Sequence, residues 1–269
     1  MKIGFIGCGN MAQAMIGGLI GSGEVLADDI VVFDCSEEQL SKVNLYNVVI
    51  AEHNRYVAVE SDVLILAVKP SEYKVVIDEI KDYVESDTIV VSIAAGLSIE
   101  ILESYFSKDV KLIRTMPNTP SLVGEGMTAI MPNAVVTDDD VSTVCNLFCS
   151  FSRSEVISEG LVDAVIASSG SSPAYVFMMI EAMADGAVRE GMSREMAYQF
   201  SAQAVYGAAK MVIETKMQPA ILKDAVCSPN GTTIEAVAEL ERSGFRASIL
   251  NAMSVCANKS RKMESREDD

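Results

Sequence analysis

The sequence predicts a doubly wound α/β sheet over residues 1–158, followed by an all-α region over residues 159–269. Three observations support this division. Short apolar β-type runs alternate with helical segments up to about residue 158, the pattern of a parallel sheet covered by helices. A glycine-rich turn follows the first run, and the β pattern disappears from Leu161 onward. The boundary between the two predicted domains rests on this change of pattern.

The expected strands are short runs of mainly apolar residues. They lie at residues 3–6, 30–33, 63–68, 89–93, 111–114, 128–131 and 155–157. In an open parallel sheet a ligand binds beyond the carboxyl ends of the strands. Gly7, Asp34, Ala67 and Ala94 directly follow or end four of these runs, so they mark the expected ligand edge.

The turn after the first strand has the form G-x-G-x-x-A, from Gly7 to Ala12. Gly7 permits a tight turn, Gly9 lets the backbone approach a pyrophosphate, and Ala12 lets the next helix pack closely on the strand. The alternative is a glycine-rich turn without a ligand. A strand before the turn and a helix after it favour a Rossmann-like dinucleotide site.

Asp34 ends the second strand, where dinucleotide-binding proteins often place a carboxylate on the ribose hydroxyls of the adenosine. Such a carboxylate repels the 2′-phosphate of NADPH, so Asp34 favours NADH. Asn54 and Arg55 offer an amide and a positive charge that could offset this repulsion. Both cofactors therefore remain open at this stage.

The second region is predicted to form long helices. Ser172 and Pro173 resemble a helix start, and Gly191 stands where a helix end needs a left-handed residue. The segments 173–190 and 194–214 are apolar on more than one face, which requires cover on several sides. So few helical residues cannot bury this surface alone, and we expect a dimer through this region. The charged tail, residues 259–269, is expected to fray.

A loop with hydroxyl side chains and a glycine, residues 227–235, runs directly into another amphipathic helix. The first N–H groups of a helix lack intrahelical partners and carry partial positive charge, so a carboxylate or phosphate is stabilised there. Ser228, Thr232 and Thr233 add hydroxyl groups at the same point. The alternative is an ordinary capping box in which Thr232 and Glu235 close the helix start.

Composition excludes several classes of protein. The net charge of −17 repels nucleic acid and anionic membrane surfaces. No apolar run reaches the ~18 residues of a membrane span, and the N-terminus does not resemble a signal peptide, so we expect a cytoplasmic protein. The six cysteines are scattered without a C-x-x-C pair, which predicts free thiols and no metal site. Aromatic residues make up only 6%, which predicts an aliphatic core.

Several further motifs together resemble those of the pyrroline-5-carboxylate reductases, which make proline by reducing a cyclic imine. The resemblance covers nearly the whole chain. Its motifs are Phe5 to Met11, Ala67-Val-Lys-Pro70, Val91 to Gly96, Arg114 to Pro120, Ser169 to Tyr175, Leu222-Lys-Asp224 and the loop 227–235. Asn230 departs from the family, which usually has glycine there; asparagine tolerates left-handed torsions, so the turn should survive. Asp34 is the second departure.

The resemblance implies a Rossmann-like doubly wound sheet followed by an all-α dimerisation domain, and a homodimer or larger assembly through the C-terminal helices. It implies that Thr233 is catalytic and that Ser228, Gly231, Thr232 and Thr233 bind the small cyclic imino acid. The cofactor is NADPH or NADH, and the family commonly uses NADPH. The implied cofactor-binding residues are Gly7, Gly9, Asn10, Met11, Ala12, Asp34, Asn54, Ala67, Val68, Lys69, Pro70, Ala94, Ala95 and Gly96. For Lys69, a solvated lysine before a proline turn is an equal alternative.

The residue types also fit imine reduction. A carbonyl reductase usually keeps a proton donor for the developing oxyanion, whereas a protonated imine accepts hydride at carbon and yields a neutral amine. The single histidine, His53, lies in the cofactor half. A β-hydroxyacid-type dehydrogenase is one alternative, but the helix after Gly170 lacks the Lys and Asn that such enzymes place there. A non-catalytic dinucleotide-binding regulator is another, although it would not need the loop 227–235.

Overall fold

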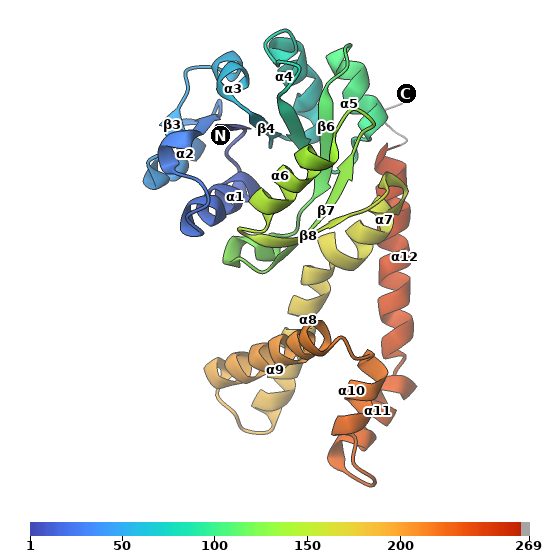
Figure 1. Cartoon of the computed structure of the whole chain (residues 1–269). Helices are drawn as coiled ribbons and strands as arrows, with labels where there is room; N and C mark the ends of the chain where they lie inside the picture. Colours follow the sequence, from blue (N-terminus) through green and yellow to red (C-terminus); the bar gives the residue numbers. More distant parts are fainter. Residues whose placement is uncertain (265–269) are drawn as a thin grey trace. The chain divides into compact units, whose positions relative to one another are not determined.

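The computed structural model describes residues 1–264, and an eight-stranded sheet forms the centre of its first unit (Figure 1). The strand order is β3-β2-β1-β4-β5-β6-β7-β8. The strands are β1 (Ile3–Ile6), β2 (Ile30–Phe33), β3 (Val49–Ile50), β4 (Val63–Leu66), β5 (Ile89–Ser92), β6 (Lys111–Met116), β7 (Gly126–Pro132) and β8 (Ser152–Val156). The order reverses between β1 and β4, which is the doubly wound arrangement.

The prediction of a parallel sheet is correct for the first six strands in the sheet order and wrong for the next. β7 runs antiparallel to β6, and β8 runs parallel to β7. The connection from β6 to β7 holds only a 3₁₀ turn, Thr119–Val123, which is too short for a parallel crossover. Sequence reasoning also missed β3, because its two residues are exposed and lack a buried apolar signal.

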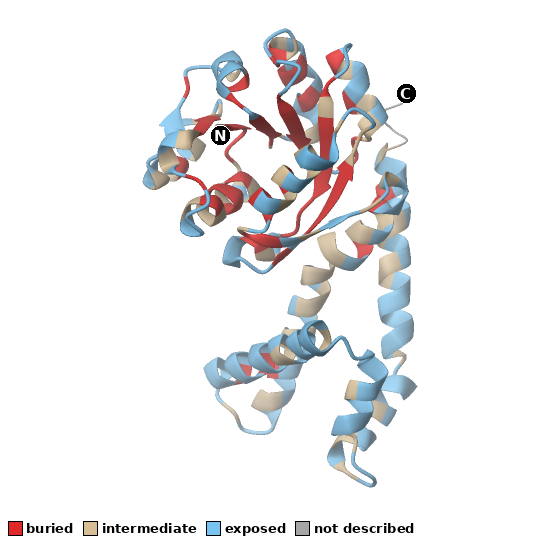
Figure 2. Cartoon of the chain, viewed as in Figure 1, coloured by how far each residue is buried: buried red, intermediate tan, exposed pale blue. Residues whose placement is uncertain are grey.

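Helices cover both faces of the sheet. They are α1 (Asn10–Gly21), α2 (Glu37–Val43), α3 (Asn54–Glu60), α4 (Tyr73–Ile80), α5 (Ile99–Phe106), α6 (Asp138–Phe148) and the short α7 (Val162–Val165). Alternation along β4 sends Val63 and Ile65 to the core cluster with α1 and α6, and Leu64 and Leu66 to the cluster with α3, α4 and α5. Both faces of β4 are therefore buried, and Figure 2 colours its buried residues red.

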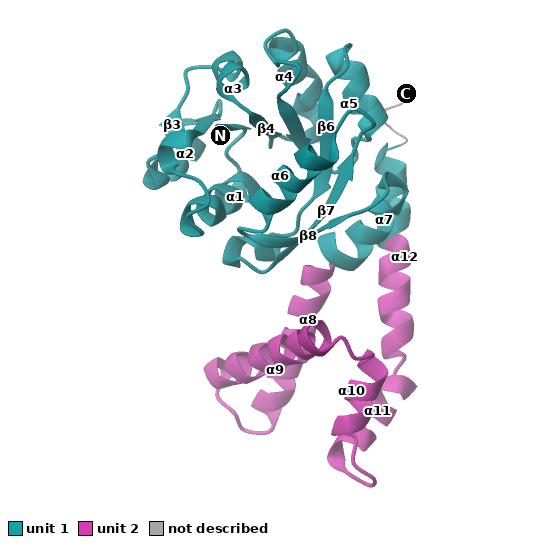
Figure 3. Ribbon diagram, viewed as in Figure 1, with its two compact units in different colours: residues 1–171, 256–269 teal, residues 172–255 magenta. Residues whose placement is uncertain are grey.

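The chain divides into two compact units (Figure 3): residues 1–171 with 256–269, and residues 172–255. By contacts, the two units divide after Ser171, and the domain boundary near residue 158 stays a prediction. The second unit holds α8 (Ser172–Arg189), α9 (Arg194–Thr215), α10 (Pro219–Val226), α11 (Thr232–Arg242) and the start of α12 (Phe245–Glu264). A π-helical turn, Ile166–Gly170, precedes α8, and Gly191 has φ +99° as expected after a helix end.

The second unit has almost no core of its own. Within residues 172–255 only Ala184, Ala197 and Ser201 are buried. Phe177 and Phe200 are 64% and 62% exposed. The helices are thus apolar on faces that this unit leaves uncovered, as the sequence analysis expected. Among residues 1–264, no helix is both long and apolar enough to cross a membrane.

A buried arginine holds the end of α12 in the first unit. The Arg114 side chain on β6 is fully buried, and its guanidinium pairs with Glu159 at 2.7 Å and with Glu264 at 2.5 Å. Glu159 also accepts a hydrogen bond from the Ile99 N–H at the start of α5. The expectation of a frayed tail is therefore wrong for residues 259–264, which are helical and paired. Residues 265–269 lie outside the described part of the chain.

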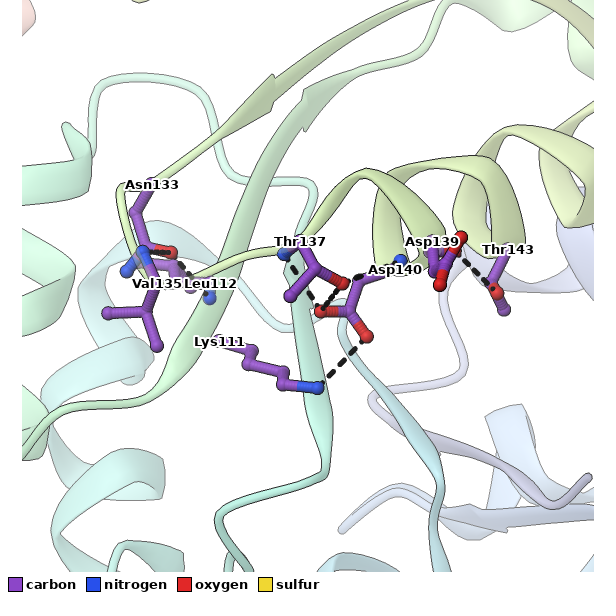
Figure 4. Close-up of polar contacts among 8 residues, drawn as sticks. All are labelled: Lys111, Leu112, Asn133, Val135, Thr137, Asp139, Asp140 and Thr143. Carbon is purple, nitrogen blue, oxygen red and sulfur yellow. Dashed lines mark hydrogen bonds and ion pairs between the residues drawn. The ribbon is translucent and has the colours of Figure 1, made fainter.

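The start of α6 carries a capping box (Figure 4). The Thr137 hydroxyl accepts a hydrogen bond from the Asp140 N–H, and the Asp140 carboxylate accepts one from the Thr137 N–H at 2.9 Å. Lys111 on β6 pairs with the same carboxylate at 3.0 Å. Burial alone would raise the pKa of Asp140, but the hydrogen bonds from Thr137 and Lys111 outweigh it and lower the pKa below its usual 3.8.

We expect Asp140→Asn to lower the free energy of unfolding at pH 7 by about 1 kcal/mol, because a charged cap and an ion pair are lost. A lowered folded-state pKa stabilises the protein above the unfolded value of 3.8, and this contribution is lost as the pH falls through the folded value. The difference between variant and wild type should therefore shrink below pH 4. Urea unfolding at pH 7 and pH 3 measures it. Asp139→Asn is the control with the same change of charge, and an equal pH response in both variants would contradict the assignment.

Candidate functional site

The turn after β1 is shaped by a close contact with the segment after β4. Gly7 has φ +96°, and a Cβ added there would lie 2.6 Å from the carbonyl carbon and oxygen of Ala67. No residue with a side chain fits this position, for reasons of both torsion and space. The backbones after β1 and β4 therefore run against each other at the point where the strand order reverses.

Gly9 leaves the start of α1 open. It is the N-cap of α1, no side chain caps the helix, and a Cβ added at Gly9 would meet nothing within 4 Å. Asn10, Met11 and Ala12 form the first turn, which contains no acidic residue, and Ala12 is buried in the core. The free N–H groups at this helix start fit a phosphate, and the absent side chain of Gly9 leaves room for it.

Asp34 is bound by backbone N–H groups on both carboxylate oxygens. Oδ2 accepts a hydrogen bond from the Cys8 N–H at 2.7 Å, and Oδ1 accepts one from the Ser36 N–H at 2.8 Å. The carboxylate thus holds the glycine turn as well as standing at the end of β2. Each oxygen keeps a further lone pair, so the group can still accept a bond from a ribose hydroxyl.

The neighbouring thiol stays uncharged. Burial, and then the charge of Asp34, raise the pKa of the Cys8 thiol to about 12. The side chain therefore adds no negative charge beside the helix start. Gln13 on α1 also ties the turn down, because its Nε2 donates to the Cys8 carbonyl at 2.7 Å and to Gln39 on α2 at 2.9 Å.

A cleft of about 530 Å³ lies at this edge of the sheet. Seven predicted cofactor residues line it together: Gly7, Gly9, Asp34, Asn54, Ala67, Val68 and Lys69. The other seven lie outside its lining: Asn10, Met11, Ala12, Pro70, Ala94, Ala95 and Gly96. Sequence reasoning missed the lining residues Cys35, Ser36, Gln39, Ser71 and Glu72. Only Ser36 carried a usable signal, as the N-cap of α2 directly after Asp34.

The basic and amide groups around the cleft differ in their availability. The exposed Lys69 forms no ion pair with any residue of 1–264. Asn54 donates to Glu79 at 2.8 Å, and the Arg55 Nε lies 3.9 Å from the same carboxylate. His53 caps α3 by accepting a hydrogen bond from the Tyr56 N–H at 3.0 Å. Lys69 is therefore the available cation, while Glu79 engages Asn54 and Arg55.

Asn118 links the end of β6 to the segment before α8. Its side-chain amide donates to the Ser169 carbonyl and hydroxyl, both at 3.2 Å, and its carbonyl accepts from the Met127 N–H at 2.9 Å. Asn118 lies in the motif Arg114 to Pro120, for which the sequence analysis gave no individual roles. The contacts give it a structural one, because the motif at residues 114–120 fixes the start of the helical region.

In the second unit, the loop before α11 has an open helix start. Gly231 is the N-cap and no side chain caps the helix, so the predicted alternative of a Thr232–Glu235 capping box is wrong. Asn230 adopts φ +57°, as expected for the residue that replaces glycine. The Gly231 N–H donates to the Ser228 carbonyl at 3.1 Å, and a Cβ on Gly231 would lie 2.4 Å from the Ser228 hydroxyl.

The hydroxyl groups of this loop are accessible. Ser228 and Thr232 are exposed, and Thr233 is half-buried on the first turn of α11. Together with the free N–H groups of the helix start they form a cradle suited to a carboxylate. In the described part of the chain, no group of three or more His, Cys, Asp or Glu side chains is placed to hold a metal ion.

Comparison with known proteins finds a matching family model in each part of the chain and relatives that match over nearly all of it. A family model described as pyrroline-5-carboxylate reductase dimerisation matches residues 159–263, and one described as NADP oxidoreductase, coenzyme F420-dependent, matches residues 2–96. The chain is 51% identical to the pyrroline-5-carboxylate reductase of Escherichia coli (strain K12), over 97% of this chain and 98% of that one. It is 39% identical to the Arabidopsis thaliana pyrroline-5-carboxylate reductase, over 97% and 95%.

Two solved structures are similar over their whole length. A pyrroline-5-carboxylate reductase from Coxiella burnetii matches with a TM-score of 0.91 and 34% identity, over 97% of this chain and 98% of that one. The Plasmodium falciparum pyrroline carboxylate reductase, solved with NADP bound, matches with a TM-score of 0.89 and 31% identity, over 98% of each chain.

Proposed function

Since this chain belongs to the family of pyrroline-5-carboxylate reductases and is an oxidoreductase, we propose that it reduces 1-pyrroline-5-carboxylate to L-proline, the final step of proline biosynthesis. The observation that supports this most directly is the loop 227–233, which presents an uncapped helix start and three hydroxyl groups for a carboxylate. The reaction also needs a hydride donor, and the cleft of the first unit would hold the dinucleotide that supplies it.

The bound dihydronicotinamide would supply a hydride to the C=N carbon. The residues of this chain have to bind and orient the imine, because a protonated imine needs no strong general acid. We assign Ser228, Gly231 and Thr232 to the substrate carboxylate. Thr233, half-buried beside them, is assigned the hydrogen bond to the ring nitrogen.

We propose NADH as the preferred cofactor. In dinucleotide-binding sheets the acidic residue at the end of β2 faces the adenosine ribose, so Asp34 would repel a 2′-phosphate by like charge. Glu79 engages both Asn54 and Arg55, so these groups are poorly placed to offset the repulsion. The comparisons support a nicotinamide dinucleotide, because one matching family model is described as an NADP oxidoreductase and one relative was solved with NADP bound. The preference for NADH is proposed from Asp34 alone.

We propose that the protein is a homodimer through the helices of residues 159–263, the range that the dimerisation model matches. The support is the second unit itself, which buries two apolar side chains and exposes large ones on every helix. A second copy would cover these faces. The six free cysteines fit a reducing compartment, and we propose the cytoplasm.

The first test is oxidation of NADH and NADPH by the purified protein with chemically prepared pyrroline-5-carboxylate. We expect Thr233→Ala to lower kcat by about 10²-fold with little change in melting temperature, because its bond matters most in the transition state. Thr233→Ser should recover most of the activity. Thr215→Ala, at the end of α9, is the control. Equal kcat with a lower melting temperature would reverse the assignment of Thr233, and no turnover with either cofactor would refute the activity.

Initial rates with each cofactor test the role of Asp34. We expect wild type to have a higher kcat/KM with NADH, and Asp34→Ser to shift the ratio toward NADPH by about tenfold or more. Asp34→Asn keeps an acceptor for the Cys8 N–H and should shift the ratio in the same direction. Asp82→Asn changes the net charge outside the cleft and should not. A strong preference of wild type for NADPH would contradict this reading of Asp34.

Light scattering after size-exclusion chromatography tests the dimer. We expect wild type to elute as a dimer or larger assembly, and Phe177→Asp with Phe200→Asp to give monomers, because two charges would enter the buried interface. Leu45→Asp is the matched control, since Leu45 is 82% exposed in the first unit. A monomeric wild type, or an unchanged assembly in the double variant, would count against this interface.

A further inference from the structure

A buried chain of hydrogen bonds joins the ends of β4 and β5. The Tyr73 hydroxyl donates to the Leu66 carbonyl at 2.5 Å, the Ser92 hydroxyl donates to the Tyr73 oxygen at 3.2 Å, and the Ala94 N–H donates to the Ser92 oxygen at 3.3 Å. Tyr73 and Ser92 are fully buried. Each hydroxyl accepts one bond and donates one, so the chain has a single direction and its bonds reinforce one another.

A further hydrogen bond ties these residues to the next strand, and the Tyr73 phenol keeps its proton. The Thr115 hydroxyl on β6 donates to the Ser92 carbonyl at 3.0 Å. Burial raises the pKa of the Tyr73 phenol well above its usual value, and the hydrogen bonds only partly offset this. The phenol is therefore a hydrogen-bond donor at every physiological pH.

Both ends of this chain of hydrogen bonds lie next to backbone segments at the cofactor edge of the sheet. Leu66 directly precedes Ala67, whose carbonyl lies against Gly7, and Val68 and Lys69 follow in the lining of the cleft. Ala94 begins the turn after β5, in which Gly96 has φ +85°. A shift of the Leu66 carbonyl or of the Ala94 N–H would thus move the backbone on the β4 and β5 side of the glycine turn.

These two segments lie on the side away from the adenosine. In a doubly wound sheet the pyrophosphate sits at the start of α1 and the adenosine lies toward β2, where Asp34 stands, so the nicotinamide half lies toward β4 and β5. We propose that Tyr73 and Ser92 are positioning residues for the nicotinamide half of the cofactor, acting through the backbone at residues 66–69 and 94–96. This inference rests on the proposed function for its cofactor.

The test compares whole cofactor with its adenosine half. Dissociation constants for NADH, NADPH and ADP-ribose are measured by calorimetry on wild type and Tyr73→Phe. Losing one buried hydrogen bond that shapes a site weakens binding by roughly fivefold to twentyfold. We expect that loss for the preferred dinucleotide, less than twofold for ADP-ribose, and a matching rise in the KM for the cofactor.

The matched control is Thr88→Val, at the opposite end of β5. The Thr88 hydroxyl is buried and donates to the Ser61 carbonyl at 3.2 Å, so this change also removes one buried bond to a backbone carbonyl. Its melting temperature should fall as in Tyr73→Phe, while the dissociation constants for the preferred dinucleotide and for ADP-ribose stay unchanged. A merely structural role for Tyr73 would give the same pattern as Thr88→Val.

Ser92→Ala provides an independent variant should Tyr73→Phe fold poorly. It should show the same selective loss, and the double variant should lose little more than either single one, because both break one chain. Equal losses for dinucleotide and ADP-ribose, or no loss, would overturn the inference. Wild type that binds the cofactor without reducing pyrroline-5-carboxylate would refute the proposed function alone, since the binding comparison would still decide the role of Tyr73.

Discussion

The contact between Gly7 and the Ala67 carbonyl is the constraint on which the cofactor site depends. At the switch point of the sheet, the backbones after β1 and β4 approach so closely that a single methyl group at Gly7 would not fit. This approach places Gly9 and the open start of α1 beside Val68 and Lys69, so one cleft includes residues from both strand ends. Asp34 holds the turn from the β2 side, and the Tyr73–Ser92 chain holds the backbone on the β4 side. The cleft is thus fixed from two directions by buried or partly buried polar groups.

The two units differ in how their stability arises. The first unit closes its own core on both faces of the sheet. The second has large apolar side chains on every helix and buries almost none of them. Its helices are therefore stable chiefly through packing against other surfaces, since isolated helices are marginal in water. The proposed carboxylate cradle at α11 belongs to this second unit, so the substrate binding and the assembly proposed above would depend on the same helices.

Local pattern was sufficient to predict seven of the eight strands, the glycine turn and the helical second region. Each depends on neighbouring residues, as with the continuous apolar runs at β1 and β4. The direction of β7 was predicted wrongly, because it depends on the length of a connection and not on the strand itself. The bond from the Cys8 N–H to Asp34, and the engagement of Asn54 and Arg55 by Glu79, join residues far apart in the chain, which a single sequence does not pair. The role of the Tyr73 phenol was missed for a different reason. The apolar pattern of α4 marks Tyr73 as a core residue and gives no sign that its hydroxyl is hydrogen-bonded.

The Arg114 cluster makes the two ends of the fold interdependent. A guanidinium that is wholly enclosed takes one of its counter-charges from Glu264, which is encoded 150 positions later. The ribosome therefore supplies the second counter-charge only when it has translated the last helix, and a message truncated before Glu264 would leave the enclosed guanidinium with Glu159 alone. A chimaera that exchanges the segments between α8 and α11 would have to keep the end of α12 to preserve this pair.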